Sequence, residues 1–237
     1  AVRFHPDGRA FYSASVDGTL KEWDSTQRCL LNTLPTPGWT PTALEVTHDG
    51  KQLISPSGDG QIVIWEIATL LPVAQLAQHQ MKINAIALSP DNHLLVSASD
   101  DKTTKLWRRE GDRFQLAKVI KAKEKPIVSV AMYRNEKDTH QLVAAKVDEV
   151  MVYQLTDDLT ISEPVMLYQS PYAIKQVAVS EKGCVAIATE DRQLTLWNLN
   201  TGDCVAKLSH EWGVTGLTFS SDSQQLVTAS ADEVLSI

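Results

Sequence analysis

One aromatic position recurs along this chain at nearly constant spacing. Trp23, Trp65, Trp107, Tyr153 and Trp197 lie 42, 42, 46 and 44 residues apart. Each of them closes a short apolar run, such as LKEW, IVIW or LTLW. Self-similarity at a fixed period of this length is typical of proteins built from stacked repeats. The repeat therefore limits the possible fold more strongly than any other feature of the sequence.

Each repeat contains four short segments with strand character, separated by turn residues. The second repeat shows the pattern in the segments ALEVTHDG, KQLISPS, IVIW and LPVAQLAQ. Short alternating runs bounded by turns, without helical periodicity, predict β-strands. A four-stranded sheet that is apolar on both faces cannot bury itself, whereas sheets packed face to face around an axis bury both faces. We therefore expect an all-β fold, a β-propeller.

The residues that carry this pattern resemble a known family. The repeat length, the pair Trp23-Asp24 and the segment HQMKINAIALSPDNHLLVSASDDKTTKLW are similar to WD40 repeats, and the resemblance covers the whole chain. It implies a WD40-type β-propeller with five four-stranded blades and an incomplete sixth. We expect one propeller region, residues 1–237, with repeats at about 1–34, 35–78, 79–120, 121–169, 170–208 and 209–237.

The first and last repeats are expected to be incomplete. Residues 1–4 resemble an innermost strand, and no outer strand stands before them. The segment ADEVLSI aligns with EDRQLTLW and stops one residue before the Trp that the repeat predicts. The interpretation is a region truncated at both ends, which belongs to a seven-bladed ring or to a larger array.

The resemblance also implies a structural tetrad. In the WD40 family a His, a Ser or Thr, a turn Asp and the recurring Trp are joined by hydrogen bonds. One set maps onto His79, Ser97 or Ser99, Asp101 and Trp107. These Asp residues are interpreted as structural rather than catalytic.

A second tetrad is expected at the end of the chain. It begins with His210 and Asp232, which are 22 residues apart, like His79 and Asp101. In the other repeats the His position holds Pro37, Lys123 or Ser170. The pattern is therefore incomplete there, most of all in the repeat that carries Tyr153.

The sequence contains no recognisable catalytic motif. It has no phosphate-binding Gly loop, G-x-S-x-G elbow or C-x-x-C pair. The segment HEWGV begins like a zinc-protease H-E-x-x-H motif, but Val214 stands at the second ligand position. The six histidines share no repeat position that would bring them to one ion. We expect no catalytic residue, no metal site and no cofactor, and hence no enzyme.

One loop position is a candidate for binding. Seven residues before the last apolar residue of each innermost strand, the repeats hold Trp39, Met81, Lys125, Tyr172 and Trp212. These loops join an outer strand to the next innermost strand and should rim one end of the central channel. Large amphipathic aromatics on a polar rim are typical anchors of protein interfaces. The alternative is that each ring packs onto its neighbouring blade.

A basic run lies on the same rim. The segment KVIKAKEKP contributes Lys121, Lys123 and Lys125, and 12 basic and 5 acidic residues lie between Lys102 and Lys146. A patch of this kind could steer an acidic partner or a phosphate, although a solvated charged loop is the alternative. The net charge of −7 makes nucleic acid an unlikely partner, which only the basic sector 102–146 supports.

These observations predict a non-catalytic WD40 β-propeller that acts as a protein–protein interaction scaffold or recognition module. The alternative is a C-terminal sensor or autoinhibitory propeller of a larger signalling ATPase or protease-type protein. A propeller enzyme or small-ligand binder using the central channel is a third hypothesis. It is disfavoured because the innermost strands are mostly apolar or contain Ser and Thr.

Two further features bear on location. No apolar run reaches the ~20 residues that cross a bilayer, so no membrane partner is expected. The three cysteines, Cys29, Cys184 and Cys204, are odd in number and far apart. This pattern indicates reduced thiols and a cytoplasmic protein.

Overall fold

The computed structural model describes residues 1–36, 40–122, 124–156, 158–220, 222–231 and 235–236. Its strands form five four-stranded antiparallel sheets and one three-stranded sheet, here called the first to the sixth sheet in chain order. The fold is therefore all-β and of the β-propeller type, with five four-stranded blades and an incomplete sixth, as predicted. Within the described ranges no helix is long and apolar enough to cross a membrane.

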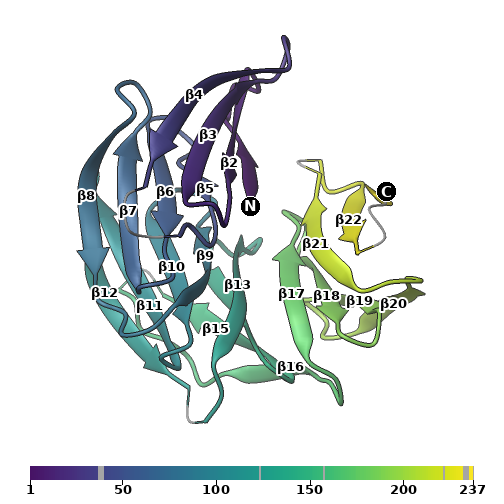
Figure 1. Ribbon diagram of the computed structural model, residues 1–237. Coiled ribbons are helices and arrows are strands. Elements are labelled where there is room, and N and C mark those ends of the chain that lie inside the picture. Colours follow the sequence, from purple (N-terminus) through teal and green to yellow (C-terminus); the bar gives the residue numbers. More distant parts are fainter. Residues whose placement is uncertain (37–39, 123, 157, 221, 232–234, 237) are drawn as a thin grey trace. The chain divides into compact units, whose positions relative to one another are not determined.

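The chain divides into two compact units, residues 1–121 and 122–237, at the predicted border of the third and fourth repeats. The first unit holds three sheets (Figure 1). The first sheet contains β1 (Val2–Phe4), β2 (Ala10–Ala14), β3 (Thr19–Asp24) and β4 (Cys29–Pro35). The second contains β5 (Glu45–Val46), β6 (Gln52–Pro56), β7 (Gln61–Glu66) and β8 (Leu71–Ala77). The third contains β9 (Ile83–Leu88), β10 (Leu94–Ser99), β11 (Thr103–Glu110) and β12 (Arg113–Lys121).

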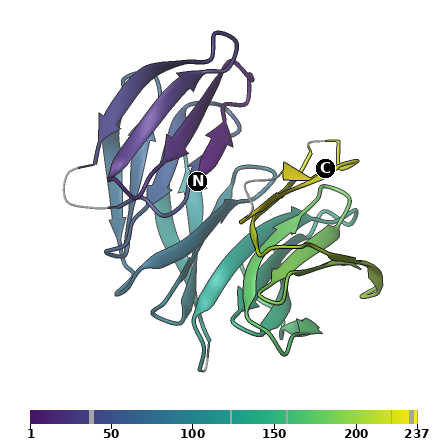
Figure 2. The ribbon, with the colours of Figure 1, turned by 45° about the vertical axis from the view of Figure 1, so that its right-hand side comes forward.

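The second unit holds the other three sheets (Figure 2). The fourth sheet contains β13 (Ile127–Arg134), β14 (His140–Lys146), β15 (Glu149–Leu155) and β16 (Val165–Gln169). The fifth contains β17 (Ile174–Val179), β18 (Cys184–Thr189), β19 (Gln193–Asn198) and β20 (Cys204–Ser209). The sixth contains β21 (Val214–Phe219), β22 (Leu226–Ser230) and β23 (Leu235–Ser236). In both units each strand pairs with its neighbour in sequence, so every sheet is a simple meander.

The second sheet shows why the strands of the first unit are apolar on both faces. Alternate residues of β6 and β7 point in opposite directions, because side chains alternate along a strand. Leu53, Val63 and Trp65 share a core cluster with residues of the first sheet. Ile54, Ile62 and Ile64 share another with residues of the third sheet. Each fully buried aliphatic side chain contributes about 1.5–3 kcal/mol, so both faces stabilise the stack.

The second unit uses smaller side chains for the same packing. The fourth and fifth sheets meet through a cluster that consists mainly of valine and isoleucine, with Val143, Val150 and Ile187 among its fully buried members. The fifth and sixth sheets meet through a smaller cluster that includes Ala186, Ala188 and Leu194. Because hydrophobic stabilisation follows the apolar area buried, the last interface gains less than those of the first unit.

A β-bulge accompanies the recurring Trp. The pairing of the third and outer strands shifts register immediately before Trp23, Trp65, Trp107 and Trp197. In the fourth sheet, where Tyr153 replaces Trp, the shift lies earlier, between Val150 and Met151. A bulge bends its strand and increases the local twist. The Trp thus marks the place where the outer strand changes register, a feature that the spacing alone did not predict.

The turn between the second and third strands holds a residue in the left-handed region. This residue is Gly60 in the second sheet (φ 87°) and Lys102 in the third (φ 65°). At Gly60 a β-carbon would lie 2.5 Å from the carbonyl oxygen of His79 and 2.9 Å from that of Met81. The turn of the second sheet therefore packs directly against the loop that leads into the third sheet.

Replacing Gly60 by alanine should lower the free energy of unfolding by about 3 kcal/mol, since it combines a left-handed residue with a steric overlap. Gly8→Ala is the matched control, because Gly8 has a similar φ of 73° but nothing within 4 Å of its β-carbon position. It should cost about 1 kcal/mol. Urea denaturation of both variants measures the difference, and equal losses would contradict the packing argument.

Candidate functional site

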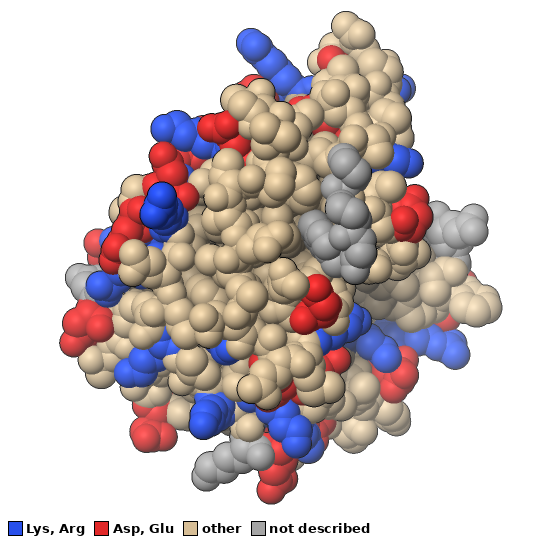
Figure 3. Space-filling model, turned by 60° about the vertical axis from the view of Figure 1, so that its left-hand side comes forward, with Lys and Arg blue, Asp and Glu red and all other residues tan. Residues whose placement is uncertain are grey.

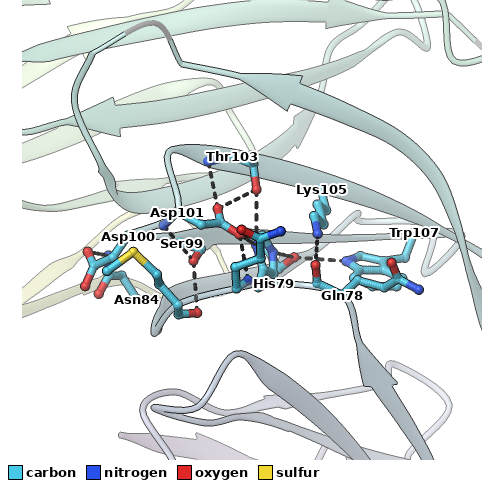
Figure 4. Close-up of polar contacts among 12 residues, drawn as sticks. Gln78, His79, Asn84, Ser99, Asp100, Asp101, Thr103, Lys105 and Trp107 are labelled. Carbon is cyan, nitrogen blue, oxygen red and sulfur yellow. Dashed lines mark hydrogen bonds and ion pairs between the residues drawn. The ribbon is translucent and has the colours of Figure 1, made fainter.

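The predicted tetrad forms a chain of hydrogen bonds in the third sheet (Figure 4). His79 precedes β9, and its Nδ1 lies 2.8 Å from Asp101 Oδ2. Its Nε2 lies 2.7 Å from Ser97 Oγ on β10. Trp107 on β11 donates its indole N–H to the same Ser97 oxygen at 2.9 Å. The four side chains therefore join the entry loop of the sheet to its second and third strands.

Every polar group in this series of hydrogen bonds has a partner only when His79 is neutral. With its proton on Nδ1, the imidazole donates to Asp101 and accepts the hydroxyl proton of Ser97 at Nε2. Ser97 Oγ can then accept the indole proton of Trp107. The side chain of His79 is 0% exposed. Burial lowers its pKa and outweighs the opposing effect of Asp101, so His79 is neutral at neutral pH.

Asp101 is ionised and holds the entry loop. Burial by itself raises the pKa of this carboxyl group, but hydrogen bonds from Thr103, His79 and the Gln80 amide outweigh it and lower the pKa to about 2. Thr103 Oγ1 lies 2.5 Å from the carboxylate and the Gln80 nitrogen lies 3.1 Å from it. The role that this geometry supports is structural, because every polar atom of the group is engaged within the sheet.

Ser99, the alternative to Ser97, makes a different connection. Its hydroxyl donates to the carbonyl oxygen of Met81 at 3.1 Å and accepts the amide of Asp101 at 3.1 Å. Ser97 therefore links His79 to Trp107, while Ser99 fixes the loop beside the turn. Both serines are fully buried.

Three residues of the candidate sites lie outside the described part of the chain. They are Trp39 and Lys123 of the candidate rim and Asp232 of the second tetrad. His210, the expected partner of Asp232, is half-buried, and its amide donates to the carbonyl oxygen of Arg192 at 2.9 Å.

A serine position that the sequence analysis missed recurs in the first unit and binds the Trp side chain in two of its three sheets. Ser13, Ser55 and Ser97 stand ten residues before Trp23, Trp65 and Trp107. Trp23 donates to Ser13 at 2.9 Å, as Trp107 does to Ser97. In the fifth sheet Ile187 occupies this position, and Trp197 donates instead to Thr195 at 3.0 Å. Counting back ten residues from each Trp would have revealed this position.

The described rim residues differ in their surroundings. Met81, Tyr172 and Trp212 are 52%, 52% and 56% exposed. Lys121 is exposed at the end of β12, whereas Lys125 forms an ion pair with Asp148. Among its described members the rim position therefore holds three exposed apolar or aromatic side chains and one lysine, Lys125, while Lys121 belongs to the neighbouring basic run.

Tyr172 and Trp212 occupy equal positions in neighbouring sheets of the second unit. They precede β17 and β21, which are joined by a 3.2 Å hydrogen bond from the Leu217 backbone amide to the side-chain oxygen of Gln176. Ser170 Oγ accepts the amide of Tyr172 at 3.1 Å and fixes its loop. Arg192 donates to the carbonyl oxygen of Glu211, beside Trp212, at 3.0 Å. Both aromatic rings are therefore presented from anchored loops at the same end of adjacent strands.

The described residues contain no group of three or more His, Cys, Asp or Glu side chains that could hold a metal ion. The geometry of this part of the chain defines a repeat propeller with a buried, hydrogen-bonded tetrad in its third sheet and exposed aromatic side chains at the ends of strands in its second unit.

Known proteins share this repeat. The sequence profile described as "WD domain, G-beta repeat" matches residues 1–24, 71–108 and 202–237. The Arabidopsis thaliana "WD repeat-containing protein 26 homolog" is 22% identical over 98% of this chain. The human "Kinesin-like protein KIF21A" is 33% identical over 43% of it. The Dictyostelium discoideum "Anaphase-promoting complex subunit cdc20" is 28% identical over 44% of it.

The chain belongs to the WD40-repeat family, as its sheets, its tetrad and these similarities agree. It spans 39% of the length of the Arabidopsis protein, 21% of the Dictyostelium protein and 6% of the human protein.

Ser97→Ala should destabilise the first unit by about 1–3 kcal/mol, because it leaves the buried indole N–H of Trp107 and Nε2 of His79 without their shared partner. Ser55→Ala is the matched control, since Ser55 is equally buried but its hydroxyl has no hydrogen-bond partner among the described residues. The control should cost much less. Thermal and urea unfolding of the pair tests this, and equal losses would argue against the hydrogen-bonded chain.

Stability should also fall as the pH decreases from about 7 to about 5. The pKa of His79 in the folded protein lies below its ordinary value of 6.5. The unfolded chain therefore binds more protons in this range, and acid favours unfolding. The contribution of Asp101 is lost at lower pH, between 3.8 and about 2. His79→Gln should flatten the upper part of the stability–pH profile, and an unchanged slope would contradict a neutral His79.

Proposed function

We propose that this chain is a non-catalytic WD40 propeller that recognises other proteins through the strand ends that carry the rim residues. The observation that carries the proposal is the pair Tyr172 and Trp212, each more than half exposed at equal positions of neighbouring sheets. Rings that served only to pack onto a blade would be largely buried. Exposed Trp and Tyr side chains are the residue types that most often dominate protein–protein binding energy.

The innermost strands favour binding over catalysis. Ser129 on β13 accepts the amide of Val177 at 3.2 Å, and Gln176 on β17 accepts the amide of Leu217 at 3.2 Å. These polar side chains link adjacent sheets through hydrogen bonds to the backbone, so these groups are already used in holding the sheets together. A general acid or base needs a free group within hydrogen-bond reach of its substrate. The strand ends are the better location for function.

The relatives give independent support. One of them is named as a subunit of the anaphase-promoting complex, which is an assembly of proteins. A protein partner for this chain is consistent with that name. The three free cysteines fit a reducing compartment, and we propose a cytoplasmic location on that ground.

Tyr172→Ala and Trp212→Ala should each weaken binding of the natural partner by about 1–3 kcal/mol if the rings are anchors. Their melting temperatures should change little, because exposed rings contribute little to folding. Met166→Ala is the matched control: Met166 is 54% exposed but lies on the outer strand β16. Quantitative pull-down from a lysate, followed by titration of the captured protein, gives the affinities.

The opposite pattern would contradict the proposal. If both aromatic variants melt at lower temperature yet bind with unchanged affinity, the rings are packing residues. If Met166→Ala reduces binding as much as they do, the outer strand is the binding surface.

A further inference from the structure

Three lysines of the first unit gather at one end of the third sheet. Lys82 lies just before β9, Lys102 in the turn between β10 and β11, and Lys121 at the end of β12. We call Lys82, Lys102 and Lys121 the lysine cluster. Lys82 was not among the candidate residues from the sequence, and Lys102 was named there only as the first residue of the basic sector 102–146.

Backbone contacts bring the cluster together. The amide of Asp100 donates to the carbonyl oxygen of Lys82 at 3.0 Å, so the entry loop lies against the turn that holds Lys102. On the other side of this turn, Thr103 is the direct cross-strand partner of Lys121. The loop, the turn and the outer strand therefore present three ammonium groups along one edge, beside the exposed side chain of Met81.

The side chains of the three lysines are accessible to a partner, whereas the nearby carboxylates already have hydrogen-bond partners. All three lysines are exposed, and none forms an ion pair within the described residues. Asp100 accepts a hydrogen bond from Asn84 at 2.7 Å. Asp101 belongs to the tetrad, and Asp59 of the adjoining turn accepts hydrogen bonds from Ser57 and Gln61. The three lysines are thus exposed, while these three carboxylates already accept hydrogen bonds from neighbouring residues.

Equivalent positions in the other sheets of this unit are uncharged. Where the third sheet has Lys102, the first and second have Gly18 and Gly60, which adopt the left-handed conformation without steric cost. The cross-strand position of Lys121 holds Pro35 in the first sheet and Ala77 in the second. The fold of a blade therefore does not require these lysines, and Lys102 occupies a conformation that a glycine would adopt more easily.

We propose that the lysine cluster and Met81 form a docking surface for an acidic segment of a partner protein. This inference rests on the proposed function and names the chemistry of the partner. Exposed lysines attract carboxylates over several ångströms and accelerate association. Met81, 52% exposed, supplies a flexible apolar contact for one hydrophobic residue within the acidic segment.

A protein segment fits better than a nucleic acid. The chain as a whole carries a net charge of −7, which repels a long polyanion but not a short segment confined to one edge. The cluster contains no exposed aromatic ring, and single-stranded nucleic acids bind by stacking on such rings. Acidic and basic side chains are interspersed on the face shown in Figure 3, around a broad uncharged area, and this face carries no continuous basic surface.

The test uses fluorescence anisotropy with the full chain. The probe is a labelled peptide in which glutamate alternates with glycine around one central leucine, and the reference peptide has glutamine in place of glutamate. The triple variant Lys82→Glu, Lys102→Glu and Lys121→Glu should weaken binding of the acidic peptide by roughly tenfold. Binding should also fall steeply with added salt, because exposed charges are screened.

Two controls keep the test specific. The triple variant Arg9→Glu, Lys51→Glu and Arg113→Glu reverses three exposed charges at the opposite ends of the strands and should bind the peptide nearly as the native chain does. Lys102→Gly removes one charge and the left-handed lysine. This variant should therefore unfold at a higher urea concentration and yet bind the acidic peptide more weakly. A variant that bound weakly because it was poorly folded would unfold at a lower urea concentration.

Several results would overturn the inference. One is equal affinity for the glutamate and the glutamine peptide, and another is an equal loss of affinity in both triple variants. A third is equal affinity for the glutamate peptide and a single-stranded oligothymidine, which would indicate a general polyanion site. None of these results would affect the capture of a partner through Tyr172 and Trp212, so failure here is distinguishable from failure of the proposed function.

Discussion

Burial of a sheet's two apolar faces against neighbouring sheets, as in the second sheet, is the constraint on which the rest of this structure depends. Leu53 and Ile54 are adjacent in sequence, yet they belong to different core clusters on opposite faces of the second sheet. A sheet of this kind is stable only between neighbours, which is why the repeat is needed at all. Packing therefore constrains the residues inside the strands, whereas the residues in the turns and loops at the strand ends are less constrained.

The polar groups of the innermost strands obey the same constraint. Innermost strands of neighbouring sheets do not pair with each other, so side chains bridge them. Thr42, just before β5, donates to the carbonyl oxygen of Ile83 on β9 at 2.7 Å, and Ser129 on β13 accepts the amide of Val177 on β17. Buried polar groups must find partners, and here they find backbone. These serine, threonine and glutamine side chains thus hold neighbouring sheets together, which agrees with the proposal that recognition takes place at the strand ends.

Sequence periodicity was sufficient for the fold, because apolar alternation and turn residues act locally and repeat. It did not separate Ser97 from Ser99, since the choice depends on the cross-strand register that places Ser97 diagonally opposite Trp107. It could not tell whether Tyr172 is exposed, because a tyrosine suits both a core and an interface. The lysine cluster was missed for a related reason: Lys82 and Lys102 are 20 residues apart in sequence, and the segments that carry them are brought together by hydrogen bonds such as that from the Asp100 amide to the Lys82 carbonyl oxygen.

The tetrad and the proposed docking surface are linked through one turn. Asp101 stands immediately before Lys102, and its carboxylate is held by Thr103, His79 and the Gln80 amide. Ser99 binds the loop that carries Met81. Residues that bind a partner lose less entropy when their backbone is already fixed. The buried hydrogen bonds of the third sheet therefore also fix the backbone that carries Met81 and Lys102, so the structural tetrad and the proposed docking surface share the same loop and turn.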